Sequence, residues 1–239
     1  MTTLLETRGL TAFYGDFQAL FGIDVTVEDG ETVALIGANG AGKSTFLRAI
    51  TGLLPVEGQH VVLGGETVAG WPADRIHKAG MAMVPEGRRL FPSLSVEENL
   101  LIGASGGRKG PWDLAAIYTL FPDLEAKKSN PGTALSGGQQ QMVAIGRALM
   151  SNPRLLLCDE ISLGLAPKVI KDIYRAVPQI REGGTAILVV EQDVGQAMAV
   201  ADRVYCFMEG RVTLTGTPAD LTRAEIAAAY FGAQEQGVA

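Results

Sequence analysis

Residues 37–44 read Gly37-Ala38-Asn39-Gly40-Ala41-Gly42-Lys43-Ser44, and Thr45 adds a second hydroxyl group directly after them. The stretch fits the pattern GxxxxGK(S/T), a glycine-rich loop whose backbone N–H groups surround phosphate groups. Before it, Thr32–Ile36 is an apolar run typical of a buried strand, and Phe46–Ile50 after it continues as a predicted helix. A strand that leads into a glycine loop and a helix directs free N–H groups and the positive end of the helix dipole to one point. The stretch therefore predicts a binding site for a nucleoside triphosphate.

Each residue type in this loop suits one task in holding a triphosphate. Glycines let the backbone close around a phosphate group without a Cβ atom in the way. Lys43 is expected to bridge the β- and γ-phosphates, and the Ser44 hydroxyl group is expected to hold Mg²⁺. The alternative is a glycine-rich turn that matches by chance, and the flanking strand and helix argue against it. The expected nucleotide-binding residues are Gly37, Asn39, Gly40, Ala41, Gly42, Lys43, Ser44 and Thr45.

The composition of the 239-residue chain is that of an ordinary globular protein of one or two domains, with 47% hydrophobic and 19% charged residues. A net charge of −6 argues against a nucleic-acid partner, which calls for a concentrated basic face. Cys158 and Cys206 lie in apolar, strand-like runs, so both are expected to be buried reduced thiols. Met1–Leu10 lacks the apolar core of a signal peptide, and no run approaches the ~20 apolar residues that span a bilayer. The expected location is cytoplasmic, with any membrane role supplied by a partner.

The order of predicted elements indicates an α/β core with a helical insertion. Leu4–Val27 alternates apolar and polar residues around turn signals, which predicts a small antiparallel sheet. From Pro85 to Pro153, predicted helices are separated by loops rich in glycine and proline. Residues 1–239 are therefore expected to form one domain, in which 1–84 and 154–239 make the nucleotide-binding α/β core and 85–153 makes a helical subdomain. Core strands are predicted at 32–36, 81–84, 155–158 and 186–190, hairpins at 61–67 and 204–215, and insertion helices at 96–102, 114–121 and 139–150.

Two acids, Asp159 and Glu160, follow the predicted strand Leu155–Cys158. A carboxylate at the carboxyl end of a core strand beside a phosphate loop is where Mg²⁺ needs a second ligand, so Asp159 is expected to bind the metal. Glu160 is expected to polarise the water that attacks the γ-phosphate. A pair of acids after an apolar strand is a weak signal alone, and the phosphate loop upstream makes the functional interpretation the favoured one.

Leu135-Ser136-Gly137-Gly138-Gln139 opens a predicted helix. Ser136 is a good N-cap, and the two glycines expose the free N–H groups of the first turn. Ser136, Gly137, Gly138 and Gln139 therefore predict a second phosphate-binding surface, although a plain capped helix is the favoured reading on physical grounds alone. Together with the phosphate loop, this order of motifs resembles the ATP-binding cassette (ABC) family over essentially the whole chain.

The resemblance implies the ABC ATPase fold, in which a P-loop NTPase (RecA-like) core carries an N-terminal antiparallel β-subdomain and an inserted helical subdomain. In that family, the Leu-Ser-Gly-Gly-Gln signature of one subunit closes on the ATP held by the phosphate loop of another. The implied cofactors are ATP and Mg²⁺. The implied partners are a second ABC ATPase subunit in a head-to-tail dimer, transmembrane permease subunits and, indirectly, a solute-binding protein, with no nucleic acid. The chain would lie at the cytoplasmic face of the inner (cell) membrane, held peripherally by the permease subunits.

Three further residues take roles from the resemblance. Tyr14 falls where the family places an aromatic ring against adenine, and its alternative role is that of a core or turn tyrosine. Glu86 stands at the Gln-loop position, where its carboxylate can offer an oxygen to Mg²⁺ but cannot donate a hydrogen bond. Gln192 replaces the switch histidine and cannot shuttle a proton, so general-base work is expected to fall on Glu160. The expected catalytic residues are Glu160, Gln192 and Lys43, and the expected metal ligands are Ser44, Glu86 and Asp159.

Val84–Arg89, Ser162–Pro167 and Val190–Asp193 are similar to the ATPase subunit of branched-chain amino-acid importers of the LivF type. Ile161 fits less well, because proline is usual there. The similarity implies ATP hydrolysis that drives uptake of branched-chain amino acids or a related small solute.

Two other classes of ABC protein are left open. An exporter ATPase commonly carries an acidic-basic pair just before the signature, where this chain has Pro131–Ala134. A soluble ABC protein acting on nucleic acid or the ribosome usually has two cassettes, coiled coils or zinc-binding cysteines.

Overall fold

The computed structural model describes residues 2–56, 61–106 and 108–231, and these residues fall into two units. The first unit comprises the described parts of Met1–Ala73 and Leu188–Ala239, and the second comprises Asp74–Ile187 with the same restriction. The predicted helical subdomain, 85–153, lies within the second unit, and its extent as a subdomain of its own stays a prediction. Each unit is described by itself.

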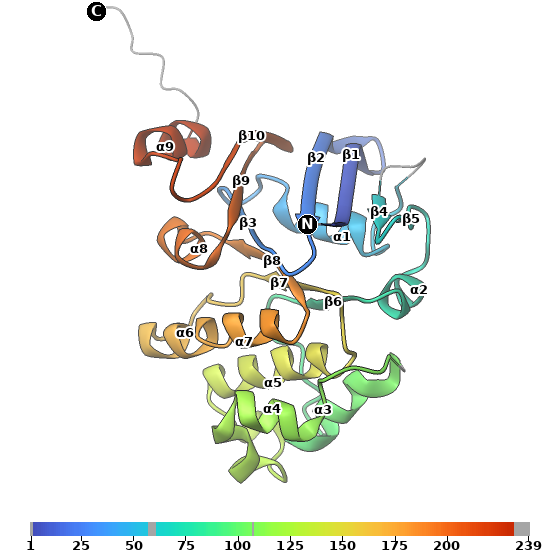
Figure 1. Ribbon diagram of the computed structural model, residues 1–239, viewed down its shortest axis with the longest axis vertical. Helices are drawn as coiled ribbons and strands as arrows, with labels where there is room; N and C mark the ends of the chain where they lie inside the picture. The colour runs from blue at the N-terminus through green and yellow to red at the C-terminus, as the bar shows by residue number, and fades with distance from the viewer. Residues whose placement is uncertain (1, 57–60, 107, 232–239) are drawn as a thin grey trace, which may run out of the picture. The chain divides into compact units, whose positions relative to one another are not determined.

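The N-terminal part of the first unit forms the antiparallel sheet that the sequence predicted (Figure 1). Strands β1 (Thr3–Tyr14) and β2 (Phe17–Glu28) pair in antiparallel fashion and are joined by a tight turn. Side chains on a strand point alternately to opposite faces, so the alternating sequence buries one face of this hairpin. Strand β4 (Val61–Leu63) pairs with β1, and β5 (Glu66–Thr67) pairs with β4, which gives the order β2-β1-β4-β5.

The core of the first unit is built on β3 (Thr32–Ile36), in which every residue is buried. It pairs in parallel with β9 (Arg203–Met208), and β10 (Arg211–Gly216) runs antiparallel to β9. Strand β8 (Ala186–Glu191), of which residues 188–191 belong to this unit, neighbours β3 in the same sheet and is also fully buried. Parallel strands with both faces covered are apolar throughout, which explains why these strands could be predicted from apolar runs.

Three helices cover the strands of the first unit. Helix α1 (Lys43–Ile50) follows β3, α8 (Val194–Val200) packs against β3, and α9 (Arg223–Phe231) packs against β9 and β10. Phe46 of α1 meets Phe207 of β9 edge to face, with ring centroids 5.6 Å apart. This contact fixes α1, and therefore the end of the phosphate loop, on the sheet.

In the second unit, β6 (Met81–Val84) pairs in parallel with β7 (Leu155–Asp159), and Val84 lies opposite Cys158. Helix α3 (Val96–Gly103) packs closely on α5 (Gly137–Leu149): a Cβ atom at Gly103 would overlap the Arg147 carbonyl oxygen. The helices that the described residues of this unit form are α2 (Ala73–Lys78), α3 (Val96–Gly103), α4 (Leu114–Leu120), α5 (Gly137–Leu149), α6 (Pro167–Tyr174) and α7 (Val177–Glu182), with 3₁₀ turns at Ala104–Gly106, Pro122–Lys127 and Gly132–Ala134.

The predicted strands, hairpins and insertion helices are confirmed to within a few residues, whereas α6, α7 and α8 were not predicted from the sequence. Cys158 and Cys206 are buried and form no disulfide bond, as expected. Burial raises the pKa of the Cys206 thiol. A hydrogen bond from Thr213 and the charge of Lys43 act to lower this pKa but offset the increase only in part. Among the helices that the described residues form, none has the length and apolarity needed to cross a bilayer.

Candidate active site

The phosphate loop adopts a backbone that only glycine accepts readily. Gly37, Gly40 and Gly42 have φ angles of 154°, 81° and 103°. A Cβ atom at Gly37 would overlap the carbonyl oxygen of Phe207, and one at Gly42 would lie 3.0 Å from the Leu20 side chain. Gly42 is the N-cap of α1 and supplies no side-chain hydrogen bond to the first turn. The first N–H groups of α1 are therefore not capped by the preceding residue, as a phosphate site requires.

Lys43 is enclosed by its own loop, with only 4% of the residue exposed. Its Nζ donates hydrogen bonds to the carbonyl oxygens of Gly37, at 2.6 Å, and Ala38, at 3.0 Å. The ammonium group is thus positioned over the loop by two backbone acceptors. A buried cation at this place can bind phosphate oxygens directly.

A turn from the other end of the chain holds the loop in place. The Gly210 N–H donates to the Ala41 carbonyl oxygen, and the Phe21 N–H donates to the Gly210 carbonyl oxygen, both at 2.9 Å. Gly210 has a φ of 72°, and a Cβ atom there would overlap the Ala19 carbonyl oxygen. The β9–β10 turn therefore links the phosphate loop to β2. The sequence predicted Gly210 only as a hairpin residue, because no local pattern shows this contact.

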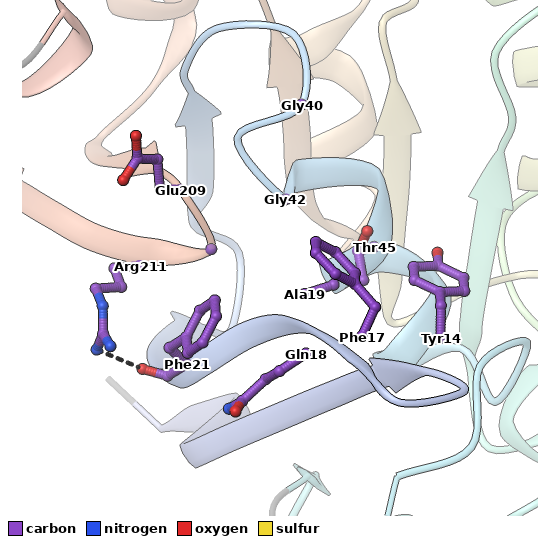
Figure 2. Close-up of a pocket in the computed structure, with 11 residues that line it drawn as sticks. Tyr14, Phe17, Gln18, Ala19, Phe21, Gly40, Gly42, Thr45, Glu209 and Arg211 are labelled. Atoms are coloured by element: carbon purple, nitrogen blue, oxygen red, sulfur yellow. Dashed lines mark hydrogen bonds between the residues drawn. The ribbon is translucent and has the colours of Figure 1, made fainter.

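A cavity of about 500 Å³ lies beside the phosphate loop in the first unit (Figure 2). Tyr14 lines it, and its role at adenine stays a prediction; the Tyr14 hydroxyl oxygen accepts a hydrogen bond from Arg48 at 3.1 Å. Burial acts to raise the pKa of Tyr14, but hydrogen bonds with Thr45 and Arg48 outweigh it, so the pKa is lowered. The lining residues are Tyr14, Phe17, Gln18, Ala19, Phe21, Gly40, Gly42, Thr45, Glu209, Gly210 and Arg211.

Ser136 is the N-cap of α5, as the sequence predicted. Its Oγ accepts from the Gln139 N–H at 3.3 Å, and its own N–H donates to Gln139 Oε1 at 3.1 Å, which together form a capping box. Gly138 must be glycine for packing, because a Cβ atom there would overlap the Val169 side chain. Ser136 is exposed. Ser136 thus caps the helix and lies at the surface, whereas Gly138 in the first turn is buried. A capped helix and a phosphate-binding surface at Ser136 are compatible interpretations.

The predicted acids lie at the ends of the two strands of the second unit. Asp159 is the last residue of β7 and is 5% exposed, and Glu160 follows it with a φ of 48°. A non-glycine residue in this left-handed region costs free energy, and such residues cluster at functional sites. Glu86 is exposed and follows β6, which runs parallel to β7, so it leaves the same edge of the strand pair as Asp159 and Glu160.

The structure brings Tyr14 together with the phosphate loop, and Glu86 together with the acids after β7. Gln192 is half-buried after β8 in the first unit and lines a different cavity, between α8 and α9. Ser44, Glu86 and Asp159 are hydroxyl and carboxylate donors, which are the hard oxygen ligands that Mg²⁺ prefers. Their chemistry therefore fits the metal predicted for them.

A glycine loop on an α/β core, an acid pair after a buried strand and a serine-capped glycine helix together define a nucleotide-binding cassette. Residues 20–162 match the ABC transporter family. The chain is 43% identical to the high-affinity branched-chain amino acid transport ATP-binding protein BraG of Pseudomonas aeruginosa, covering 96% of this chain and all of that protein. The chain therefore belongs to the ABC transporter family and is one of its ATP-hydrolysing subunits.

Solved structures agree with this assignment and with the predicted ABC ATPase fold. MJ1267, an ATP-binding cassette of an ABC transporter, superposes with a TM-score of 0.84 at 25% identity, covering 97% of this chain and 100% of that one. The ATP-binding cassette MJ0796, described as a dimer in a post-hydrolysis state with ADP and Pi, superposes with a TM-score of 0.79 at 25% identity, covering 90% and 99%.

Proposed function

We propose that this chain is the ATP-binding and hydrolysing subunit of an importer for branched-chain amino acids or a related small solute. The observation that carries the proposal is its 43% identity to BraG over the full length of that protein. The stretches that resembled the LivF type in the sequence, Val84–Arg89 and Val190–Asp193 among them, point the same way. The chain would act at the cytoplasmic face of the membrane, bound to permease subunits.

In this proposal, two cassettes pack head to tail and share each ATP. The triphosphate lies between Lys43 of one cassette and Ser136 and Gly138 of the other. The buried Lys43 and the exposed N-cap Ser136 of α5 support this division, because the first can bind phosphates and the second is accessible to another chain. The dimer described for MJ0796 with ADP and Pi gives a precedent in a relative. The second cassette is either a copy of this chain or a paralogue.

Within the shared site, Glu160 orients and activates water for in-line attack on the γ-phosphate, while Lys43 and the amides of the loop stabilise the developing negative charge. Ser44, Asp159 and Glu86 are the residues that would hold Mg²⁺, which when bound supplies further positive charge to the phosphate oxygens. Gln192 donates its amide N–H to the γ-phosphate. Loss of that phosphate weakens the interface between cassettes, and residues 85–153 pass the movement to the permease.

Uptake of labelled leucine tests the transport part of this proposal. A host strain in which the gene for this chain is deleted is expected to lose leucine uptake at low external leucine concentration. Wild-type chain supplied in trans restores it and the Lys43→Ala variant does not, because transport needs ATP binding. If the deletion strain takes up leucine, isoleucine and valine normally while the purified chain hydrolyses ATP, the ATPase assignment stands and the proposed substrate class is rejected.

Replacing Gln192 with alanine is expected to slow ATP turnover moderately, by about 2- to 13-fold, because a typical hydrogen bond contributes about 0.5–1.5 kcal/mol. Steady-state phosphate release at saturating ATP measures the effect. Gln192→His, which introduces the residue usual in the family, serves as the control and is expected to retain at least wild-type turnover. A loss in Gln192→Ala as deep as that of a Glu160 variant would show that Glu160 is not the principal base.

A further inference from the structure

Phe17 is an exposed aromatic residue at the mouth of the nucleotide cavity. It is 71% exposed, more than any other large apolar side chain of the described residues. Single exposed apolar residues are common on protein surfaces and need no explanation by themselves. Phe17 differs because it lines the cavity that also contains Gly40, Gly42 and Thr45 of the phosphate-loop region.

The hairpin register places Phe17 next to Tyr14. Tyr14 is the last residue of β1, Phe17 is the first residue of β2, and the two are direct partners across the strands. Residues opposite each other in an antiparallel pair have their Cβ atoms about 4.5–5.5 Å apart on the same face. Figure 2 shows both rings rising from the hairpin toward α1. Two aromatic rings and the phosphate loop therefore border the same cavity.

The two rings differ in how they are held. Tyr14 is fixed through its hydroxyl group, which Arg48 and Thr45 contact. Phe17 has no polar group, so its ring can contribute only apolar and stacking contacts. A flat, apolar ligand surface is the partner that such a ring suits.

We propose that Phe17 is a second aromatic contact for the purine ring of the bound nucleotide, alongside Tyr14. The inference rests on the proposed ATPase function, since it is the triphosphate held by the loop that directs the base into this cavity. Every base has a π-face, so stacking adds affinity without selecting one base over another. Phe17 therefore contributes to affinity for ATP and GTP alike and leaves base selection to other groups.

The test compares Phe17→Ala with Phe13→Ala in the full-length chain. Phe13 lies on the same hairpin and is 46% exposed, but it does not line the cavity. Stacking of a base on an aromatic side chain contributes about 1–3 kcal/mol of binding free energy per base. Phe17→Ala is therefore expected to raise the KM for ATP by about 5- to 150-fold, with kcat within about twofold of the wild type. Phe13→Ala leaves both constants unchanged, and Phe17→Trp restores the low KM.

Inorganic triphosphate, which has no purine, separates this role from a general disturbance of the loop. Its inhibition constant is expected to be the same for the wild type and Phe17→Ala, while the KM values for ATP and GTP rise together. An unchanged KM for ATP in Phe17→Ala would overturn the proposal, and so would an equal loss of affinity for inorganic triphosphate. Failure of the ATPase function itself is a separate result, seen as wild-type chain that hydrolyses no ATP either alone or mixed with a paralogous partner cassette.

Discussion

Replacement of Glu160 by glutamine is expected to lower ATP turnover by about 10²- to 10⁴-fold, the usual contribution of a general base, while ATP binding stays intact. Glutamine has nearly the same shape as glutamate but cannot take a proton from water. Glu160 directly follows Asp159 at the end of β7 and is held at a φ of 48°, a conformation that glutamine can adopt at similar cost. Phosphate release at saturating ATP gives the turnover, and calorimetric titration gives the dissociation constant for ATP.

Glu182→Gln is the matched control for this experiment. Glu182 is exposed at the end of α7 in the same unit, so the variant removes the same charge without touching the acid pair. It is expected to behave as the wild type. Near-normal turnover in Glu160→Gln would remove Glu160 from the role of base, whatever the control shows.

Replacement of Lys43 by alanine is expected to weaken ATP binding by about 150-fold or more, since a hydrogen bond to a charged group contributes about 1.5–3 kcal/mol and Lys43 is expected to reach two phosphates. The dissociation constant for ATP, measured by calorimetry, checks the expectation. Lys43 also donates to the carbonyl oxygens of Gly37 and Ala38, so its loss affects the loop itself.

Two comparisons separate the loss of charge from damage to the loop. Lys43→Met keeps most of the apolar length of the buried side chain and is expected to lose ATP affinity as Lys43→Ala does. Lys78→Ala removes an exposed lysine at the end of α2 and is expected to bind ATP normally. Wild-type affinity in Lys43→Met, confirmed to be folded by its melting temperature, would refute the phosphate-loop assignment.

The features of the site that could be predicted from the sequence are those written in a few consecutive residues. The loop from Gly37 to Ser44 carries its glycines, lysine and hydroxyl in a fixed spacing, and Ser136 stands directly before the helix that it caps. Glycine spacing and capping depend on local backbone geometry, so a local pattern is sufficient to predict them.

Contacts between distant residues could not be predicted in this way. The Gly210 N–H supports the phosphate loop at Ala41, and Phe17 joins Tyr14 at the cavity only because the hairpin register brings it there. Neither contact leaves a signal in the neighbouring sequence, although the Glu209-Gly210 turn was visible as a hairpin. The roles of Glu86 and Gln192 stay predictions from resemblance.

The secondary structure followed the same rule. Strands β3 and β8 are continuous apolar runs with both faces buried, and such runs are visible in the sequence. Helices α6, α7 and α8 are six to eight residues long and were not predicted, although α3 and α4, which are no longer, were predicted. Pro167 is the first residue of α6, and proline at this position is a signal for the start of a helix. A prediction based on apolar periodicity does not use this signal.

The central claim is that one chain does not contain a complete ATPase site, because Ser136 of a second cassette must close on the ATP held by Lys43. The rate of ATP hydrolysis per chain, measured while the purified protein is diluted from micromolar to nanomolar concentration, tests it most directly. A shared site predicts a rate per chain that falls toward zero on dilution, as cassettes separate, or that is near zero throughout if the partner is a paralogue. A constant, substantial rate per chain at dilutions where mass photometry shows only monomers would contradict it.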